Sequence, residues 1–368
     1  LLFLCSIFMI FSANAAPYRA VLVADIDTGR VLYQENANEL NYPASLTKIM
    51  TLYLTFDALE HNRLHLDDYL IVSQYAADAQ PVKLGLTAGS KIKVEDAIKA
   101  VAVHSANDVA RVLAENLKGG KEGNFATLMT RVANDIGLEH TNFENSSGLP
   151  NDDHMSTARD IALLSMAVYK HFPQYWKYFG IKNWTYNGKT YTNGNRLLGT
   201  YPGCDGMKTG FTNKSKYSLV ATAKRDGHHL IAVVLGAKNK DVRANVATKM
   251  LNIGFNKLGV QTSSNAYQPQ THTVAPTSAN PVVKYAQSNT KPVSYSGGGV
   301  GVQCGAFSSY TSAKNQAQRV QNVVGLMPDI EQNDAGLYRV RIKGLSESAA
   351  VNAKNMAGAN GIDCYTFH

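Results

Sequence analysis

The chain has few cysteines and no long apolar run after its first residues. Its 368 residues include four cysteines, none in a C-x-x-C spacing, so we expect no metal site. After the apolar segment 1–11, no run approaches the roughly 18 apolar residues of a membrane-spanning helix. Charged residues make up only 17% of the chain and hydrophobic residues 45%, which is typical of a folded globular protein rather than a disordered one.

Positive charge exceeds negative charge but is not concentrated. Lys and Arg number 36 against 28 Asp and Glu, a formal net charge of +8. The sequence lacks a basic stripe with interleaved aromatic residues, so we expect no nucleic-acid partner. Scattered positive charge favours solubility and attraction to anionic surfaces of the cell envelope.

The first fifteen residues resemble a secretory leader. An almost wholly apolar segment, 1–11, is followed by Ser-Ala-Asn-Ala at 12–15, which is a cleavage signal of the A-x-A type. An initiating Met and a basic n-region are both lacking, so we interpret the start as truncated. Eleven residues are too short to cross a bilayer. We therefore predict a signal peptide over 1–15, export to the periplasm or cell envelope, and no membrane anchor after the leader is removed.

Residues 16–258 are predicted to form one large domain of mixed α and β structure (α+β). β-Rich segments stand at both ends and helical patterns lie between them, which indicates one mostly antiparallel sheet with a helical insert. Asp226-Gly227 marks a hairpin, and residues 157–160 resemble a capping box. The expected strands are 19–26, 31–34, 207–211, 217–224 and 230–236, and the expected helices are 43–59, 94–117, 124–136 and 241–253.

A linker and a second, smaller domain are expected to follow. Residues 259–299 are rich in Gln, Ser, Thr, Asn and Pro and end in three glycines, a composition typical of a flexible tether. Residues 300–368 predict strand, helix, two strands, helix and strand, a ferredoxin-like βαββαβ order.

Three short motifs stand in a fixed order along the chain. Ser45 and Lys48 form Ser-x-x-Lys, Ser105 and Asn107 form Ser-x-Asn, and Lys-Thr-Gly occupies 208–210. The first two motifs recur elsewhere by chance, but Lys-Thr-Gly occurs once, and only Ser45 opens a long apolar helical pattern. The ordered set is typical of penicillin-binding proteins and class A β-lactamases and indicates serine acyl transfer.

Ser45 is predicted to be the nucleophile and Lys48 its base. Residues i and i+3 share a helix face, so the amine can reach the hydroxyl. A serine N–H in the first helical turn has no partner within the helix and can donate to an oxyanion. Burial and a second cation, Lys208, would lower the pKa of Lys48 and so supply the base that serine needs. The alternative is a surface Ser and Lys on an amphipathic helix.

Ser105 and Asn107 precede the helical run 109–117. Ser105 is expected to pass a proton between Lys48 and the leaving amine, while Asn107 holds Lys48 and a substrate amide. Ser and Asn are also favoured N-cap residues, so capping is the alternative interpretation, and both can hold at once.

Lys-Thr-Gly is expected on a strand beside the substrate. Lys208 would supply positive potential and Thr209 a hydroxyl for a substrate carboxylate, while Gly210 would let the substrate backbone approach closely. The Phe211 amide would be the second oxyanion donor. Arg243 follows the last strand and either helps to bind the carboxylate or lies on the surface.

The motifs and their surroundings resemble the D-alanyl-D-alanine carboxypeptidase family of low-molecular-weight penicillin-binding proteins. The matching strings are PASLTKIMT (43–51), NSSGL (145–149), HMSTA (154–158) and DGMKTGFT (205–212). The resemblance covers about two thirds of the chain, from 18 to 256, and implies a β-lactamase/transpeptidase-like domain. The linker starts directly after this unit, where many relatives carry a β-rich domain and an anchoring helix.

The family resemblance implies an activity and its partners. Ser45 would form an acyl-enzyme on the penultimate D-Ala of a peptidoglycan stem pentapeptide, release the terminal D-Ala and react with β-lactams. This chemistry needs neither a metal nor a cofactor. A His-based triad through His154 is rejected because a lysine base makes it unnecessary, and Cys204, where relatives often have an aliphatic residue, is interpreted as a buried residue rather than a reactive thiol.

Residues 300–368 resemble a SPOR domain, a peptidoglycan-binding module, through VQCGAF (302–307) and YRVR (338–341). Such a domain leaves one sheet face for glycan strands. Strict alternation puts Val302, Cys304 and Ala306 on the core face and Gln303 and Phe307 on the other. The predicted glycan-binding residues are Gln303, Arg341 and Tyr365. Because the first and last strands adjoin in this fold, Cys304 and Cys364 could form a disulfide, and two reduced core cysteines are the alternative.

Two other functions share these features. A β-lactamase has the same motifs but deacylates quickly, commonly through a Glu-activated water, for which Glu139 and Glu144 are available in the sequence. A glycan-binding wall protein without activity is the second alternative, and the intact motifs disfavour it.

Overall fold

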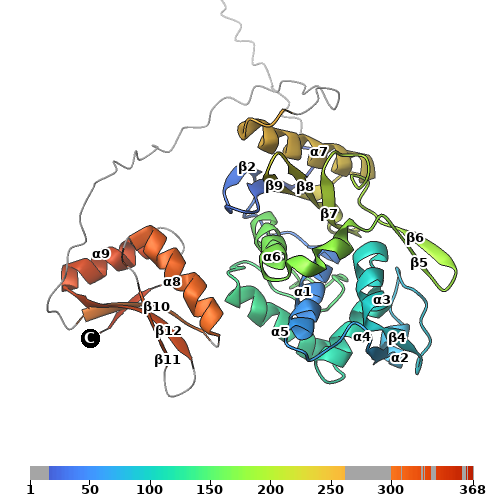
Figure 1. The fold of residues 1–368 in the computed structure, drawn as a ribbon, viewed down its shortest axis with the longest axis horizontal. Helices are drawn as coiled ribbons and strands as arrows, with labels where there is room; N and C mark the ends of the chain where they lie inside the picture. The colour runs from blue at the N-terminus through green and yellow to red at the C-terminus, as the bar shows by residue number, and fades with distance from the viewer. Residues whose placement is uncertain are drawn as a thin grey trace, which may run out of the picture. The chain divides into compact units, whose positions relative to one another are not determined.

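The computed structural model describes residues 16–261 and 300–367, apart from 308, 325, 327, 333–336, 359–361 and 363. The chain divides into two compact units, Leu1–Pro269 and Gln270–His368, which are described separately (Figure 1). The predicted leader and the 262–299 part of the predicted linker lie outside the described residues. In the described ranges no helix is both long enough and apolar enough to cross a membrane.

The first unit is built on a five-stranded antiparallel sheet in the order β2-β1-β9-β8-β7. The N-terminal strand β1 pairs along its whole length with β9, so the beginning of the domain meets its end as the strand pattern predicts. The strands are β1 (Ala20–Asp25), β2 (Val31–Glu35), β7 (Cys204–Thr212), β8 (Lys216–Arg225) and β9 (His228–Ala237).

Both faces of this sheet are buried. Alternate side chains of β1 point to opposite faces of the sheet. Leu22 belongs to the core on the side of α1 (Lys48–Glu60) and α6 (Ala158–His171). Val21 and Val23 belong to the core under α7 (Lys240–Lys257). Figure 1 shows α7 on one side of β8 and β9 and α6 on the other. The mixed α/β architecture is the predicted one.

The helical part lies between β2 and β7 in the sequence. Thr157 caps α6 as predicted, because its Oγ1 accepts a hydrogen bond from the Asp160 N–H at 3.0 Å. Its other elements are α2 (Gln74–Ala77), α3 (Val94–Lys99), α4 (Asn107–Leu117), α5 (Glu122–Asp135), the 3₁₀ segment Pro173–Gly180, and the small strand pairs β3 (Tyr69–Ile71) with β4 (Lys91–Lys93) and β5 (Asn183–Tyr186) with β6 (Lys189–Thr192).

The predicted continuous helix over 94–117 is wrong in one respect. After α3 the chain forms a π-helical turn, Ala100–His104, and stops at Ser105, whose φ of 67° is left-handed. A left-handed residue cannot continue a right-handed helix, so α4 starts afresh at Asn107. This break places Ser105 and Asn107 at a bend instead of along one helix face.

The second unit has the predicted βαββαβ order. Its sheet order is β11-β12-β10-β13, so the first and last strands are neighbours and both pair antiparallel. Val302, Cys304, Val340 and Ile342 belong to its core. The elements are β10 (Val300–Phe307), α8 (Tyr310–Val324), β11 (Asp329–Gln332), β12 (Tyr338–Leu345), α9 (Glu347–Gly358) and β13 (Tyr365–Phe367).

Strict alternation fails at the end of β10. The pairing with β12 shifts register between Gln303 and Ala306, and Gly305 there has a φ of 124°. Such a bulge reverses the side-chain alternation beyond it. Ala306 is therefore exposed and Phe307 packs on the core, the reverse of the prediction.

A disulfide joins Cys304 on β10 to Cys364 next to β13, across 60 residues of sequence. A bridge that closes so long a loop restricts the unfolded chain strongly. We expect the Cys304→Ser/Cys364→Ser double variant to lower the free energy of unfolding of this unit by about 2–4 kcal/mol. Calorimetry of the full chain should show one transition moving to lower temperature and that of the first unit unchanged. Identical thermograms for the unaltered protein and the double variant would contradict this prediction.

Candidate active site

Ser45 lies in a tight turn that leads directly into α1. The turn is 3₁₀-helical, Ala44–Thr47, and α1 begins at Lys48. Lys48 Nζ donates a hydrogen bond to Ser45 Oγ at 3.0 Å, so the predicted contact between positions i and i+3 is present. Ala44 has a left-handed φ of 49°, which is strained for a residue with a Cβ. The serine hydroxyl is thus presented at a strained turn.

Lys48 is wholly enclosed. Its relative exposure is 0%, which rules out the alternative of a surface lysine. Besides Ser45, its Nζ donates to Asn107 Oδ1 at 2.7 Å and to the Ser147 carbonyl at 2.6 Å. These three acceptors match the three N–H groups of an ammonium and fix the position of the nitrogen one hydrogen bond from Ser45.

Burial is the main influence on the charge of Lys48. Desolvation lowers the pKa of Lys48 well below its usual value, and the positive charge of Lys208 lowers it further. The negative charges of Glu122 and Asp108 act in the opposite direction. The neutral amine, which is the form that can accept a proton, is therefore more accessible in Lys48 than in an exposed lysine.

The Ser105–Asn107 bend contributes one free hydroxyl and one fixed amide. Ser105 Oγ is buried and has no hydrogen-bond partner among the described residues. Asn107 donates through Nδ2 to the Gln80 carbonyl at 2.8 Å while its Oδ1 accepts from Lys48. The amide therefore has a defined orientation, whereas the Ser105 hydroxyl can turn toward a substrate.

A segment of the chain, residues 80–86, is attached to the same bend. The Asn107 N–H donates to the Val82 carbonyl at 2.7 Å. The buried Asp108 carboxylate accepts hydrogen bonds from the backbone N–H groups of 84, 85 and 86 at 3.1, 3.0 and 3.3 Å. Asp108 was not recognised from the sequence, because an Asp in the first turn of a helix is also favoured by the helix dipole.

Strand β7 places Lys-Thr-Gly against the nucleophile turn. A Cβ on Gly210 would lie 3.1 Å from the Pro43 carbonyl oxygen and 3.3 Å from the Ser45 nitrogen, so only glycine allows this approach without displacement. Lys208 is buried, and its Nζ donates to the Thr209 carbonyl at 3.0 Å. Phe211, the next residue, is exposed.

Lys208 and Arg243 form a positive region. Burial and the nearby charge of Arg243 lower the pKa of Lys208 to about 7. Arg243 is 5% exposed and donates to the Gly194 carbonyl at 3.0 Å, so the alternative surface position does not hold. Its Nε has no partner among the described residues. A bound carboxylate would compensate both cations.

His154 supports the nucleophile turn through a hydrogen bond to Thr47. Its Nδ1 accepts from the Glu144 N–H at 3.2 Å, so its Nε2 carries the proton and donates to Thr47 Oγ1 at 2.8 Å. Burial lowers the pKa of His154 to about 4, which keeps the ring neutral. Burial also raises the pKa of the Cys204 thiol to about 11, as expected for an unreactive cysteine.

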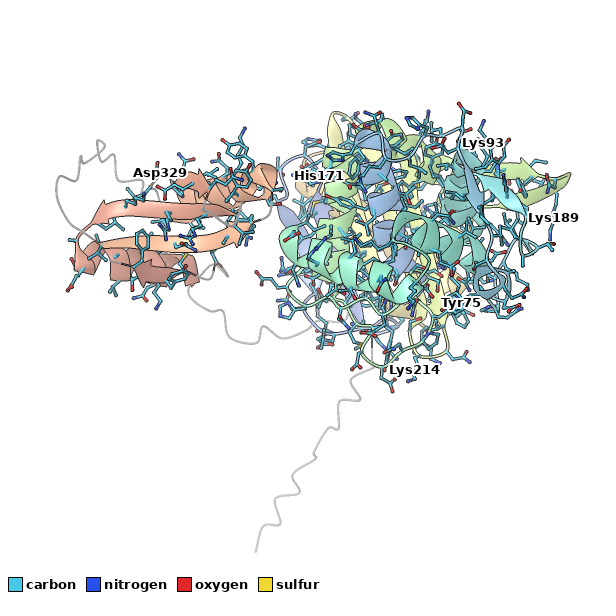
Figure 2. All side chains as sticks on the ribbon, turned by 90° about the horizontal axis from the view of Figure 1, so that it is seen from below. Tyr75, Lys93, His171, Lys189, Lys214 and Asp329 are labelled. Carbon is cyan, nitrogen blue, oxygen red and sulfur yellow. A yellow bond between two sulfur atoms is a disulfide. The ribbon has the colours of Figure 1, made fainter. Side chains whose placement is uncertain are left out.

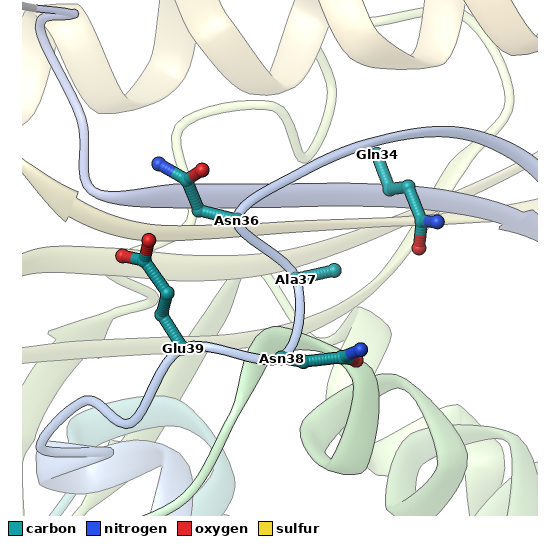
Figure 3. A pocket seen from close by; sticks show the side chains of 5 residues that line it. All are labelled: Gln34, Asn36, Ala37, Asn38 and Glu39. Atoms are coloured by element: carbon teal, nitrogen blue, oxygen red, sulfur yellow. The ribbon is translucent and has the colours of Figure 1, made fainter. Parts of the chain in front are cut away.

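A separate hollow lies after β2, lined by residues 34 and 36–39 (Figure 3). Its lining contains none of the motif residues. Within the described part of the chain, no group of three or more His, Cys, Asp or Glu side chains could hold a metal ion.

The second unit brings the predicted glycan-binding residues together. Gln303 pairs with Arg341 on one side and with Tyr365 on the other. Gln303 is buried, and its Oε1 accepts from Arg341 Nε at 2.8 Å. The Arg341 guanidinium lies 4.3 Å from the centre of the Phe367 ring, and Tyr365 is 54% exposed. Residues 303, 341 and 365 thus occupy adjacent positions on one sheet face.

An antiparallel sheet flanked by helices, with Ser-x-x-Lys, Ser-x-Asn and Lys-Thr-Gly converging beside it, defines the class of DD-peptidases and penicillin-binding serine enzymes. Residues 10–239 match the model of the D-alanyl-D-alanine carboxypeptidase family, Peptidase S11. The chain belongs to this family. Residues 296–366 match the SPOR domain model.

Individual relatives agree with this assignment. The chain is 35% identical over 244 residues to the D-alanyl-D-alanine carboxypeptidase DacF of Bacillus subtilis and 39% identical over 250 residues to DacC of Escherichia coli, matching 65% and 66% of this chain. It spans 62% of the length of each of these two relatives.

Solved structures show the same fold. DacD from Francisella tularensis has a TM-score of 0.62 at 29% identity, covering 68% of this chain and 73% of that one. Penicillin-binding protein D2 from Listeria monocytogenes, in its ampicillin-bound form, has a TM-score of 0.60 at 31% identity, covering 66% and 99%.

Proposed function

We propose that this protein is a serine D-Ala-D-Ala carboxypeptidase that removes the terminal D-Ala from peptidoglycan stem pentapeptides. The observation that carries the proposal is the buried Lys48 amine, one hydrogen bond from Ser45 Oγ and held by Asn107. Membership of the carboxypeptidase family supports the choice of substrate.

The proposed reaction begins with a proton transfer. Neutral Lys48 accepts the Ser45 proton as Oγ attacks the carbonyl carbon of the penultimate D-Ala. The N–H groups of Ser45 and Phe211 donate to the oxyanion. When the C–N bond breaks, the amine of the leaving D-Ala receives the proton from Lys48 through the Ser105 hydroxyl. A water then hydrolyses the Ser45 ester, and its proton returns the serine to its starting form.

Substrate binding is assigned to the positive region. The terminal carboxylate would accept hydrogen bonds from Thr209 and lie near Lys208 and Arg243, whose uncompensated charges favour an anion there. The same contacts suit a penicillin, which presents a carboxylate next to its strained amide. No step of this scheme calls for a metal or a cofactor.

A β-lactamase is the second candidate function. It would use the same acyl-enzyme but hydrolyse it quickly. Glu139 and Glu144 are both exposed, and Glu144 accepts a hydrogen bond from Asn142, so neither is presented as an enclosed base. The lifetime of the penicillin adduct separates the two functions: hours support the carboxypeptidase and milliseconds the β-lactamase.

The decisive experiment combines two assays on the full chain. D-Ala release from a purified stem pentapeptide is measured, and intact mass is recorded after treatment with benzylpenicillin. We expect release of one D-Ala per peptide and a single long-lived adduct on Ser45. Sacculus binding without D-Ala release or an adduct would favour a non-catalytic wall protein and overturn the proposal.

For the second unit we propose binding to peptidoglycan glycan strands, which would hold the enzyme at the cell wall in the envelope. Gln303, Arg341 and Tyr365 supply polar and aromatic groups on one sheet face, the combination that suits a sugar chain. The SPOR match and the leader-like 1–11 segment support a protein that works at the wall.

We expect Arg341→Met to weaken binding to purified sacculi about tenfold, because charged hydrogen bonds are worth about 1.5–3 kcal/mol. Met retains part of the packing on Phe367. Co-sedimentation of the full chain with sacculi measures the effect. Lys354→Ala, which removes an exposed cation from α9, is the matched control and should bind normally. Equal loss in both variants would point to net charge instead of a defined face.

A further inference from the structure

Glu122 is a buried carboxylate that the proposed reaction does not use. It is the first residue of α5 and 7% exposed. Its Oε1 accepts from the Ser146 N–H at 2.9 Å and from the Ser146 hydroxyl. Its Oε2 accepts from the Tyr75 hydroxyl at 2.6 Å and lies 3.5 Å from Arg111 Nε. An acidic residue in the first turn of a helix usually faces solvent, whereas this one faces residues 146–147.

Two successive carbonyls of that segment face α1. The Ser146 carbonyl accepts from Thr51 Oγ1 at 2.6 Å, and the Ser147 carbonyl accepts from Lys48 Nζ at 2.6 Å. On the other side, the N–H and the hydroxyl of Ser146 both donate to the Glu122 carboxylate. The carboxylate therefore lies one residue away from an acceptor of the lysine base.

Several charged or titratable side chains act on Lys48 from different elements. Lys208 on β7 lowers its pKa, whereas Glu122 on α5 and Asp108 on α4 raise it, Glu122 more than Asp108. His154 is neutral because of its own burial and the charge of Lys48. Glu122 itself faces Arg111 on α4 and Tyr75 on α2. Tyr75, which is labelled in Figure 2, is exposed.

We infer that Glu122 is a positioning residue for acylation. It holds residues 146–147 against Lys48, and its negative charge offsets the effect of the positive charge of Lys208 on that lysine. The inference rests on the proposed function, because it concerns the lysine base of the acylation step. Glu122 does not touch the reacting atoms and acts only through Lys48. Its removal should alter both the geometry and the charge of the base.

The test is the pH dependence of Ser45 acylation by benzylpenicillin in Glu122→Gln. The acid limb of this profile reports the protonation of Lys48, because only the neutral amine accepts the serine proton. Removing a nearby negative charge favours the neutral amine, so the limb should move to lower pH by about half a unit or more. The rate at the plateau should fall as well, since a neutral amide holds residues 146–147 less strongly.

Two variants separate position from charge. Thr51→Val releases the other side of Ser146 without changing any charge, and Glu122→Asp keeps the charge on a shorter side chain. Both should lower the plateau and leave the acid limb where it is in the unaltered protein. A general loss of structure would lower the rate at every pH. It would not move the acid limb in Glu122→Gln while leaving it in place in the other two variants.

Arg111→Gln keeps the inference testable should Glu122→Gln fail to fold. It removes the cation beside Glu122 and leaves the three hydrogen-bond donors to that carboxylate in place. Its acid limb should therefore move to higher pH, opposite to that of Glu122→Gln. If the acid limb of Glu122→Gln does not move, the inference is overturned. If Glu122→Gln does not fold, the inference is overturned when the acid limb of Arg111→Gln stays in place or moves to lower pH. Absence of any adduct on Ser45 in the unaltered protein would instead overturn the proposed function.

Discussion

The Lys48→Met variant is expected to be acylated by benzylpenicillin about 10³- to 10⁴-fold more slowly than the unaltered protein. Met fills much of the same buried volume but carries no base, so the Ser45 hydroxyl keeps its proton and remains a weak nucleophile. The rise of the acylation rate with pH should also disappear, because that rise reflects loss of the proton from Lys48. The measurement is a time course of intact mass at several pH values.

Two controls accompany this prediction. Ser45→Ala should form no adduct at any time, since the oxygen that carries the acyl group is gone. The Lys48→Met protein leaves the Asn107 and Ser147 oxygens without their buried donor, which costs about 1–3 kcal/mol for each. Its melting temperature must therefore be recorded to show that it is folded. Rapid acylation of folded Lys48→Met, or an adduct in Ser45→Ala, would contradict the assigned nucleophile and base.

Gly148→Ala is expected to reduce acylation at least about 100-fold, because it displaces the turn that carries Ser45. Gly148 has a φ of +80°, and a Cβ there would lie 1.7 Å from the Ala44 carbonyl oxygen and 2.8 Å from Thr47 Oγ1. Two backbone segments are in direct contact at this point, so the conflict cannot be relieved by rotating a side chain. The strain and the overlap together should lower the free energy of unfolding by about 2–5 kcal/mol.

Gly89 provides a matched control for Gly148. It has the same φ of +80°, but no heavy atom lies within 4 Å of a Cβ built on it. Gly89→Ala therefore has the conformational strain alone, about 1 kcal/mol, and should keep its activity. Chemical denaturation and acylation kinetics of both variants test the comparison. Equal effects of the two substitutions would show that contact with the nucleophile turn is unimportant.

Much of the fold followed from local patterns. The strands at the two ends of the first domain, the helix after Ser45, the cap at Thr157 and the βαββαβ order of the second unit were all predicted correctly. They depend on periodicity, turn residues and capping, which neighbouring residues decide. The bulge at Gly305 reversed the expected faces of Ala306 and Phe307, because one irregular residue changes every later position in the strand.

The site was predictable where spacing along the chain decides a contact. Ser45 and Lys48 lie one helical turn apart, so their hydrogen bond could be expected from the sequence. The partners of Lys48 on distant segments could not. The Ser147 carbonyl is a backbone acceptor without a sequence signal, and Glu122 is indistinguishable in sequence from an ordinary acidic residue at a helix start.

The amino-acid sequence alone therefore determined which hydroxyl and which amine would meet, because a helix brings positions three apart together whatever surrounds it. Only the tertiary structure decided whether that amine could lose its proton. The pKa of Lys48 depends on its complete burial and on charges contributed by β7, α4 and α5, segments that folding brings together from 60 to 160 residues further along the chain. Long-range packing sets the dielectric and the electrostatic field around Lys48, and a short sequence motif determines neither of them.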